Sequence, residues 1–175
     1  MRAEEFIDRL RFAMPSAEVL GGYGLDEQEV QEIQDGFRVS SRSEPEQSAN
    51  DVGEIGRLLG LYDCTSLEVG LVRFDAKVTT IYGGHRFGAC EADPLAVKPS
   101  GAVVMYDHAI SGAEVVRCAA DPERFLDALA EFLQVRSEKD VWKGRATQAA
   151  ERCRIASGEP SSFPFYQMLC GFLGG

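Results

Sequence analysis

Residues 66–118 carry the feature that most constrains the fold, a series of short segments that favour β-strands and are separated by tight turns. In the first segment, Leu67, Val69 and Leu71 alternate with polar or small residues, which is typical of a strand with one buried face. Parallel neighbours need crossover connections of a dozen or more residues, and the turns here are shorter. The segments therefore predict a mainly antiparallel sheet, with further strands at 77–82, 94–97, 102–107 and 113–118.

Segments in which apolar residues recur at three- and four-residue spacing lie on both sides of this region. Such spacing places the apolar side chains on one face of a helix. The sequence therefore predicts an α+β fold, in which a central, mainly antiparallel meander sheet of four to six strands is flanked by N-terminal and C-terminal helices. The expected helices lie at 6–14, 26–37 and 51–60 before the sheet, and at 121–135, 137–156 and 163–173 after it.

Residues that favour helix ends support most of these boundaries. Pro15 disfavours helical geometry at Met14, so the first helix should end there. Asp26 and Glu29 have the spacing of a capping box at the start of the second helix. Other expected boundaries are Asp51 and Gly60 for the third helix, Asp121 with Pro122 for the fourth, and Ser137 or Asp140 for the fifth.

The C-terminal segment 163–173 is too apolar to be a free surface helix. We expect it to pack across the sheet or the 121–135 helix and complete the core, with a subunit contact as the alternative. In the preceding helix Val141, Ala149 and Ile155 are the weaker candidates for buried positions. The segment 38–50 has almost nothing to bury and is expected to be a loop.

At 175 residues the chain is long enough for one domain with a substantial core, and we expect a single domain over 1–175. The formal net charge of −10 opposes nucleic-acid binding, because a phosphate backbone attracts Lys and Arg. It favours steering towards a basic protein partner. The apolar runs are shorter than a membrane span, and the acidic residues at the N-terminus do not fit a secretory signal, so we expect a cytoplasmic protein.

The five cysteines are an odd number, are widely spaced and include no C-x-x-C pair. This distribution argues against a disulfide framework and against a zinc knuckle, so most should be small buried apolar residues. Neither glycine-rich stretch, 21–24 or 83–84, has the spacing of a phosphate-binding loop. The sequence therefore predicts no cofactor.

The stretch 86–109 is the densest cluster of potentially reactive residues. As a thiol hydrolase, the chain would use Cys90 as nucleophile and His108 as base, with Asp107 or Asp93 orienting the imidazole. The opposing interpretation is a hairpin whose polar residues lie on turns, with Asp93 before Pro94 starting a turn. We favour the hairpin, because no signature of a catalytic cysteine surrounds Cys90 and because adjacent residues of a strand point to opposite faces.

A metal site is a further interpretation of the same stretch. His85, Cys90, Glu91, Asp93 and His108 have suitable ligand types, but only Glu91 and Asp93 have the tight spacing that is usual for metal ligands. We therefore predict no metal site.

Residues 23–135 resemble the SUKH superfamily, which includes fungal cell-wall assembly regulators and many bacterial immunity proteins. The segment 23–34 is similar to the family's opening helix, whereas its usual proline and aromatic step after that helix is replaced by 39–47. The resemblance implies an α+β protein-binding module that often neutralises a toxin. The residues that carry it in and after the sheet are Phe87-Gly88, Asp93, Leu95-Ala96-Val97, Gly101, Val103-Val104, Asp107-His108, Phe125-Leu126 and Leu129.

The sequence therefore predicts a non-enzymatic binding protein of the immunity type, with 137–175 as a helical extension outside the resemblance. The expected partner is a basic toxin domain, and the expected assembly is a monomer or a weak homodimer. The alternatives are a regulatory or scaffold protein of the same fold, and the thiol hydrolase that uses Cys90 and His108. The predicted partner-binding residues are Glu91, Asp93, Asp107 and His108, together with the acidic segment 44–54 if it orders on contact.

Overall fold

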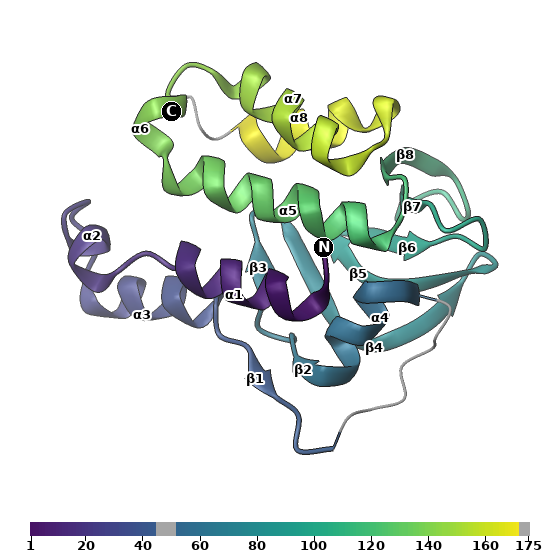
Figure 1. Cartoon of the computed structure of the whole chain (residues 1–175), viewed down its shortest axis with the longest axis horizontal. Coiled ribbons are helices and arrows are strands. Elements are labelled where there is room, and N and C mark those ends of the chain that lie inside the picture. Colours follow the sequence, from purple (N-terminus) through teal and green to yellow (C-terminus); the bar gives the residue numbers. More distant parts are fainter. Residues whose placement is uncertain (45–51, 172–175) are drawn as a thin grey trace.

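The computed structural model describes residues 1–44 and 52–171. It has the predicted α+β architecture (Figure 1), with a six-stranded antiparallel sheet whose spatial order follows the chain, β3-β4-β5-β6-β7-β8. The strands are β3 (Glu68–Val69), β4 (Val72–Ile81), β5 (Gly84–Cys90), β6 (Asp93–Val97), β7 (Val103–Tyr106) and β8 (Glu114–Ala119), and a separate two-stranded sheet pairs β1 (Ser40–Ser41) with β2 (Tyr62–Asp63).

The meander confirms the predicted antiparallel sheet, but the strand bounds differ. The expected first strand turns at Gly70 and Leu71, β4 begins at Val72 and not at residue 77, and β5 was not expected. Its glycines interrupt the alternation by which strands are found, yet one of them is required by the sheet. A Cβ atom on Gly88 would lie 2.2 Å from the backbone oxygen of Arg73 on β4. The close approach of β4 and β5 therefore depends on a residue without a side chain.

The two faces of the sheet differ in what covers them. Leu95 and Val97 face the main core, whereas Ala96 lies on the opposite face and packs with Val104 and Tyr106 in a small second cluster. The register of the β4–β5 hairpin breaks between the Phe74/Gly88 and Thr79/Arg86 pairs, which is the effect of a bulge. Beyond this break, Ile81 packs against the second cluster, and the Tyr82 ring lies 5.1 Å from that of Tyr106.

Helices from both ends of the chain cover the other face. Figure 1 shows α5 between α1 and the α7–α8 pair, with α2 and α3 at the end of the molecule away from β8. The bounds are α1 (Ala3–Ala13), α2 (Ala17–Gly21), α3 (Glu27–Asp35), α4 (Gly53–Leu61), α5 (Pro122–Ser137), α6 (Lys139–Trp142), α7 (Ala146–Ser157) and α8 (Phe163–Cys170), with a short 3-10 helix, η2 (Pro160–Ser162), before α8.

Several helix ends agree with the sequence. Helix α1 ends before Pro15, and α5 begins after Asp121, whose carboxylate accepts the Arg124 N–H at 2.7 Å. The capping box of α3 is present, with Asp26 and Glu29 each accepting the backbone N–H of the other at 2.9 Å. These ends form locally, so residue type is enough to predict them.

Other boundaries were wrong. Gly60 lies inside α4, which continues to Leu61, and Ser137 is the last residue of α5. The expected late helix is divided into α6 and α7, and Val141 and Ile155 are exposed, whereas Ala149 is buried as predicted. The expected cap Asp51 and most of the acidic segment 44–54 lie outside the described residues. Glu54 is in the first turn of α4, where its carboxylate accepts the Ala3 N–H at 2.8 Å.

A chain of aromatic contacts joins the sheet to the C-terminal segment. The ring of Phe125 on α5 lies 5.5 Å from Phe87 on β5 and 6.2 Å from Phe165 on α8. The buried Tyr166 hydroxyl donates a 2.9 Å hydrogen bond to the Cys118 carbonyl oxygen on β8. The prediction that the apolar C-terminal segment completes the core is therefore confirmed for its described part. No helix in the described ranges has the length and apolar character needed to cross a membrane.

Candidate functional site

Three of the four predicted partner-binding residues meet at one end of the sheet. Asp93 begins β6, and Asp107 and His108 directly follow the neighbouring β7. The Asp93 carboxylate accepts the His108 backbone N–H at 3.0 Å and lies 2.6 Å from Nδ1 of the His108 ring. We call Asp93, Asp107 and His108 the strand-end cluster. Antiparallel pairing explains it, because the start of one strand lies beside the end of the next.

Much of the hydrogen-bonding capacity of this cluster is used within the protein itself. The bond from His108 lowers the pKa of the Asp93 carboxyl, and Asp93 in turn raises the pKa of His108. One Asp107 oxygen accepts the N–H groups of Ala109 and Ile110, at 2.6 and 3.2 Å. The cluster thus shapes the β7–β8 loop, as turn acids commonly do.

Glu91, the fourth predicted residue, lies in the β5–β6 turn with a positive φ of 52°. Its N–H donates to the Leu71 carbonyl at 3.0 Å, and its own carbonyl accepts a 3.3 Å bond from Arg73. The backbone of Glu91 therefore fixes the turn, whereas its side chain is exposed to solvent.

The strand-end cluster has the ligand types of a metal site. One ligand atom each from Asp93, Asp107 and His108 lies within 4.8 Å of the others. A metal ion bound through Nδ1 of His108 would have to replace the existing bond to Asp93. Of the other candidates, His85 pairs with Val97 at the far end of β5, and Cys90 belongs to the main core.

Cys90 lacks the properties of a nucleophilic thiol. It is only 2% exposed, and burial, together with the nearby charges of Glu91 and Asp93, raises its pKa to about 12. A nucleophilic cysteine reacts as the thiolate and needs a lowered pKa. The geometry therefore does not favour the hydrolase alternative.

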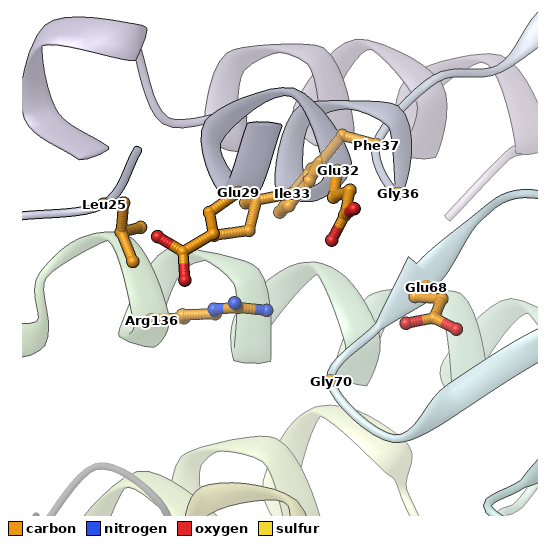
Figure 2. Close-up of a pocket in the computed structure, with 9 residues that line it drawn as sticks. All are labelled: Leu25, Glu29, Glu32, Ile33, Gly36, Phe37, Glu68, Gly70 and Arg136. Carbon is orange, nitrogen blue, oxygen red and sulfur yellow. The ribbon is translucent and has the colours of Figure 1, made fainter. Parts of the chain in front are cut away.

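A different region contains an open groove of about 390 Å³ between α3, the β3–β4 turn and the C-terminal half of α5 (Figure 2). We call it the α3–α5 groove. Three glutamates, one arginine and several apolar groups line it, and the Glu29 and Glu32 side chains point from α3 towards α5 in Figure 2. The lining residues are Leu25, Glu29, Glu32, Ile33, Gly36, Phe37, Glu68, Gly70 and Arg136.

The sequence of α3 explains why this wall is open and acidic. The helix contains four acidic residues, no basic residue and no fully buried residue, so only its Ile33 side, continued by Phe37, attaches it to the core. Gly70 on the opposite side has a positive φ of 65°, and a Cβ there would meet the Phe132 ring at 2.9 Å. The groove is therefore bounded by charged side chains above an apolar floor.

Arg136 is the only cationic residue of the groove lining, and within the described ranges its guanidinium pairs with no carboxylate. It lies 5.9 Å from the centre of the Phe37 ring, a cation–π distance. Desolvation by the surrounding protein lowers its pKa. Since one cation faces Glu29, Glu32 and Glu68, the lining carries an excess of negative charge.

One further hollow adjoins this groove, and a second adjoins the first hollow through Ala13, Leu133 and Ser137. The first, of about 250 Å³, shares Ile33, Phe37 and Arg136 with the groove, and the second, of about 430 Å³, lies between α1 and α5. Large apolar side chains stand exposed beside them: Phe12 is 94% exposed, and the others are Met14, Val19 and Tyr23. Contiguous exposed apolar surface is typical of interaction sites.

No family model, curated protein or solved structure matches this chain. Residues of the chain itself must therefore support any functional conclusion.

Sequence reasoning did not find the groove. Of the four acids of α3, only Glu29 had a predicted role, in the capping box, although four acids without a base in nine positions are a detectable signal. Glu68 and Arg136 come from distant segments, so their place beside α3 follows from the packing alone.

Proposed function

We propose that this chain is a non-enzymatic protein-binding module, and more specifically an immunity-type protein that neutralises a toxin by binding it directly. The observation that carries the proposal is the acid-lined α3–α5 groove, together with the exposed Phe12 of α1 and the adjoining hollow lined by Val19 of α2. Protein interfaces combine a few apolar anchors with a polar rim, and this region offers both.

The charge of the chain supports a basic partner. A net charge of −10 attracts a cationic protein over a distance and raises the rate of association more than the affinity. The resemblance of residues 23–135 to the SUKH superfamily supports the same class of function. The acids of the sheet end, Glu91, Asp93 and Asp107, and their neighbour His108 remain predicted partner-binding residues.

The first experiment is a pull-down from the native organism with the tagged full chain, followed by mass spectrometry. A partner recovered in stoichiometric amount is then produced in a heterologous host with and without this chain, with an empty vector as control. We expect a basic partner that arrests growth alone and is tolerated when the chain is present. A stoichiometric partner that is harmless would favour the regulatory or scaffold alternative, and continued arrest despite a formed complex would contradict neutralisation.

A further inference from the structure

We propose that the α3–α5 groove receives a lysine or arginine side chain from a basic segment of a protein partner. This inference rests on the proposed function and names the place where a basic partner makes its central contact. The occupant's aliphatic stem would lie against Ile33 and Phe37, and its charge would lie among the carboxylates of Glu29, Glu32 and Glu68. Lysine and arginine have this combination of an apolar stem and a charged end.

The charges around the groove favour a cation over an anion. Three carboxylates and one guanidinium line the cavity, so an entering anion would meet net repulsion and an entering cation net attraction. The groove acids are only partly paired within the chain. Glu29 accepts the Asp26 backbone N–H at 2.9 Å. Glu32 accepts an amide hydrogen bond from Gln28 at 2.9 Å, and the nearest Glu68–Arg73 approach is a loose 3.8 Å.

The composition of α3 adds a reason for such an occupant. Glu29, Glu32 and Asp35 follow one another at three-residue intervals, and like charges at this spacing repel each other. Arg38 pairs with Asp35 at 3.0 Å, which leaves Glu29 and Glu32 as the acids nearest the groove. A cation held beside the helix would relieve this repulsion. Binding should therefore weaken as salt screens the charges.

The adjoining hollow indicates which kind of residue lies next to the lysine or arginine in the partner segment. The neighbouring 250 Å³ hollow includes Val19, Leu20 and Tyr23 and shares part of the groove wall. A partner segment with an apolar residue close to its lysine or arginine would therefore fill both spaces. A nucleic acid or an anionic membrane surface would meet the same carboxylates unfavourably.

The test uses the full-length ¹⁵N-labelled protein and two probe peptides, acetyl-Gly-Leu-Lys-Lys-Leu-Gly-amide and its counterpart in which both lysines are replaced by glutamate. We expect the lysine peptide to shift the amide signals of residues 29–37, 68–70 and 136, and the glutamate peptide to leave them unchanged. Shifts that centre on residues 91–93 and 107–110 would overturn the groove assignment while leaving a basic partner in place. Binding of neither peptide, or equal binding of both, would also overturn it.

Two groove variants, one that removes negative charge and one that removes positive charge, sharpen the test. Glu32 and Glu68 are both exposed, so the double variant Glu32→Gln/Glu68→Gln should fold normally and should weaken binding of the lysine peptide about fivefold. Arg136→Gln should tighten it by about threefold, because it removes the one cation of the lining. The matched controls are Glu18→Gln/Asp140→Asn and Arg117→Gln, which make the same charge changes at exposed residues outside the groove lining. Equal effects of groove variants and controls would mean attraction by net charge alone and would overturn the proposal.

The outcome of the groove test can be distinguished from the outcome of the test of the proposed function. Suppression of toxicity in co-expression tests the function without reference to the groove. If suppression survives Glu32→Gln/Glu68→Gln and the complex shows no loss of affinity, the function stands and the groove assignment fails. If the peptide binds in the groove but no toxin is neutralised, the groove assignment stands and the immunity function fails.

Discussion

The strand-end cluster and the α3–α5 groove both contain acidic residues, yet they use them differently. In the cluster, Asp93 bonds His108, and Asp107 accepts two backbone N–H groups of its own loop. In the groove, Glu29 accepts the Asp26 N–H, but Glu32 has only an amide bond from Gln28 and Glu68 only a 3.8 Å ion pair with Arg73. The groove also contains Arg136, for which the described residues provide no carboxylate partner. The difference teaches that the number of acids in a region says less about binding than whether local backbone and side-chain groups already satisfy them.

The packing around the strand-end cluster is also tighter than the packing around the α3–α5 groove. The strand-end cluster is attached to the tightly paired meander, where even one Cβ on Gly88 has no room. The groove is formed by α3, which has no fully buried residue, and the same part of the molecule includes the hollow lined by Phe12, which is almost wholly exposed. One end of the molecule is thus constrained by packing, whereas the other is open to solvent.

The largest expected effect is on the alkylation rate of Cys90. A reactive thiol there would distinguish the strand end as a catalytic site. With a pKa raised to about 12, its thiolate fraction at pH 7.5 is about a thousandfold below that of a free cysteine. Iodoacetamide should therefore leave Cys90 unmodified in the native protein and should modify all five cysteines after denaturation, as peptide mass spectrometry would show. Rapid and selective labelling of Cys90 in the native state would revive the hydrolase alternative.

Replacing a glycine by alanine should lower the free energy of unfolding at the tightly packed end of the molecule and not at the open end. Gly88→Ala places a Cβ against the Arg73 backbone oxygen and should lower the free energy of unfolding by about 3 kcal/mol. Gly21→Ala at the end of α2 meets no atom within 4 Å and should leave stability unchanged or raise it by about 0.5 kcal/mol. Urea unfolding followed by circular dichroism measures both. Similar losses in the two variants would remove the distinction between the ends.

A pair of apolar substitutions compares the two regions as binding surfaces. Phe12→Ser should change the free energy of unfolding by less than about 0.5 kcal/mol, because the ring is 94% exposed. It should nevertheless weaken binding of the captured partner about tenfold, as loss of an apolar anchor does. Ile110→Ser, which removes an exposed residue beside the strand-end cluster, is the matched control. Calorimetric titration that found Ile110→Ser the more damaging would move the interface to the sheet end.

The smallest effect is the response of the Asp93–His108 pair to pH. Its stabilising contribution should be greatest between the ordinary pKa values of the two groups, 3.8 and 6.5. It falls at lower pH as Asp93 takes up a proton through its lowered pKa, and at higher pH as His108 loses one through its raised pKa. In Asp93→Asn the pKa of His108 should fall, which NMR titration of the imidazole signals measures, with the His85 signals as internal control. An unchanged pKa of His108 would show that the ion pair does not form in solution.

The sequence predicted the fold better than the groove because the two depend on interactions of different range. Leu95 and Val97 alternate with Ala96, and Asp26 lies three residues from Glu29, so strands and helix starts follow from neighbours in the chain. The strand β5 was missed because Gly88 serves a contact with another strand. For the same reason, Asp93 and His108 were recognised as candidates, while their direct bond was found only in the structure.

The sequence by itself determined the α+β layout, the acidic charge, the capped helices and the apolar C-terminal segment, because each depends on residue type and local spacing. Only the tertiary structure decided which acids remain available to a partner. Packing brings Glu32, Glu68 and Arg136 to one cavity from positions far apart in the chain, and it buries Cys90 beneath the sheet end. Charge and reactivity depend on these surroundings, since neighbours and access to water set the energy of every charged group.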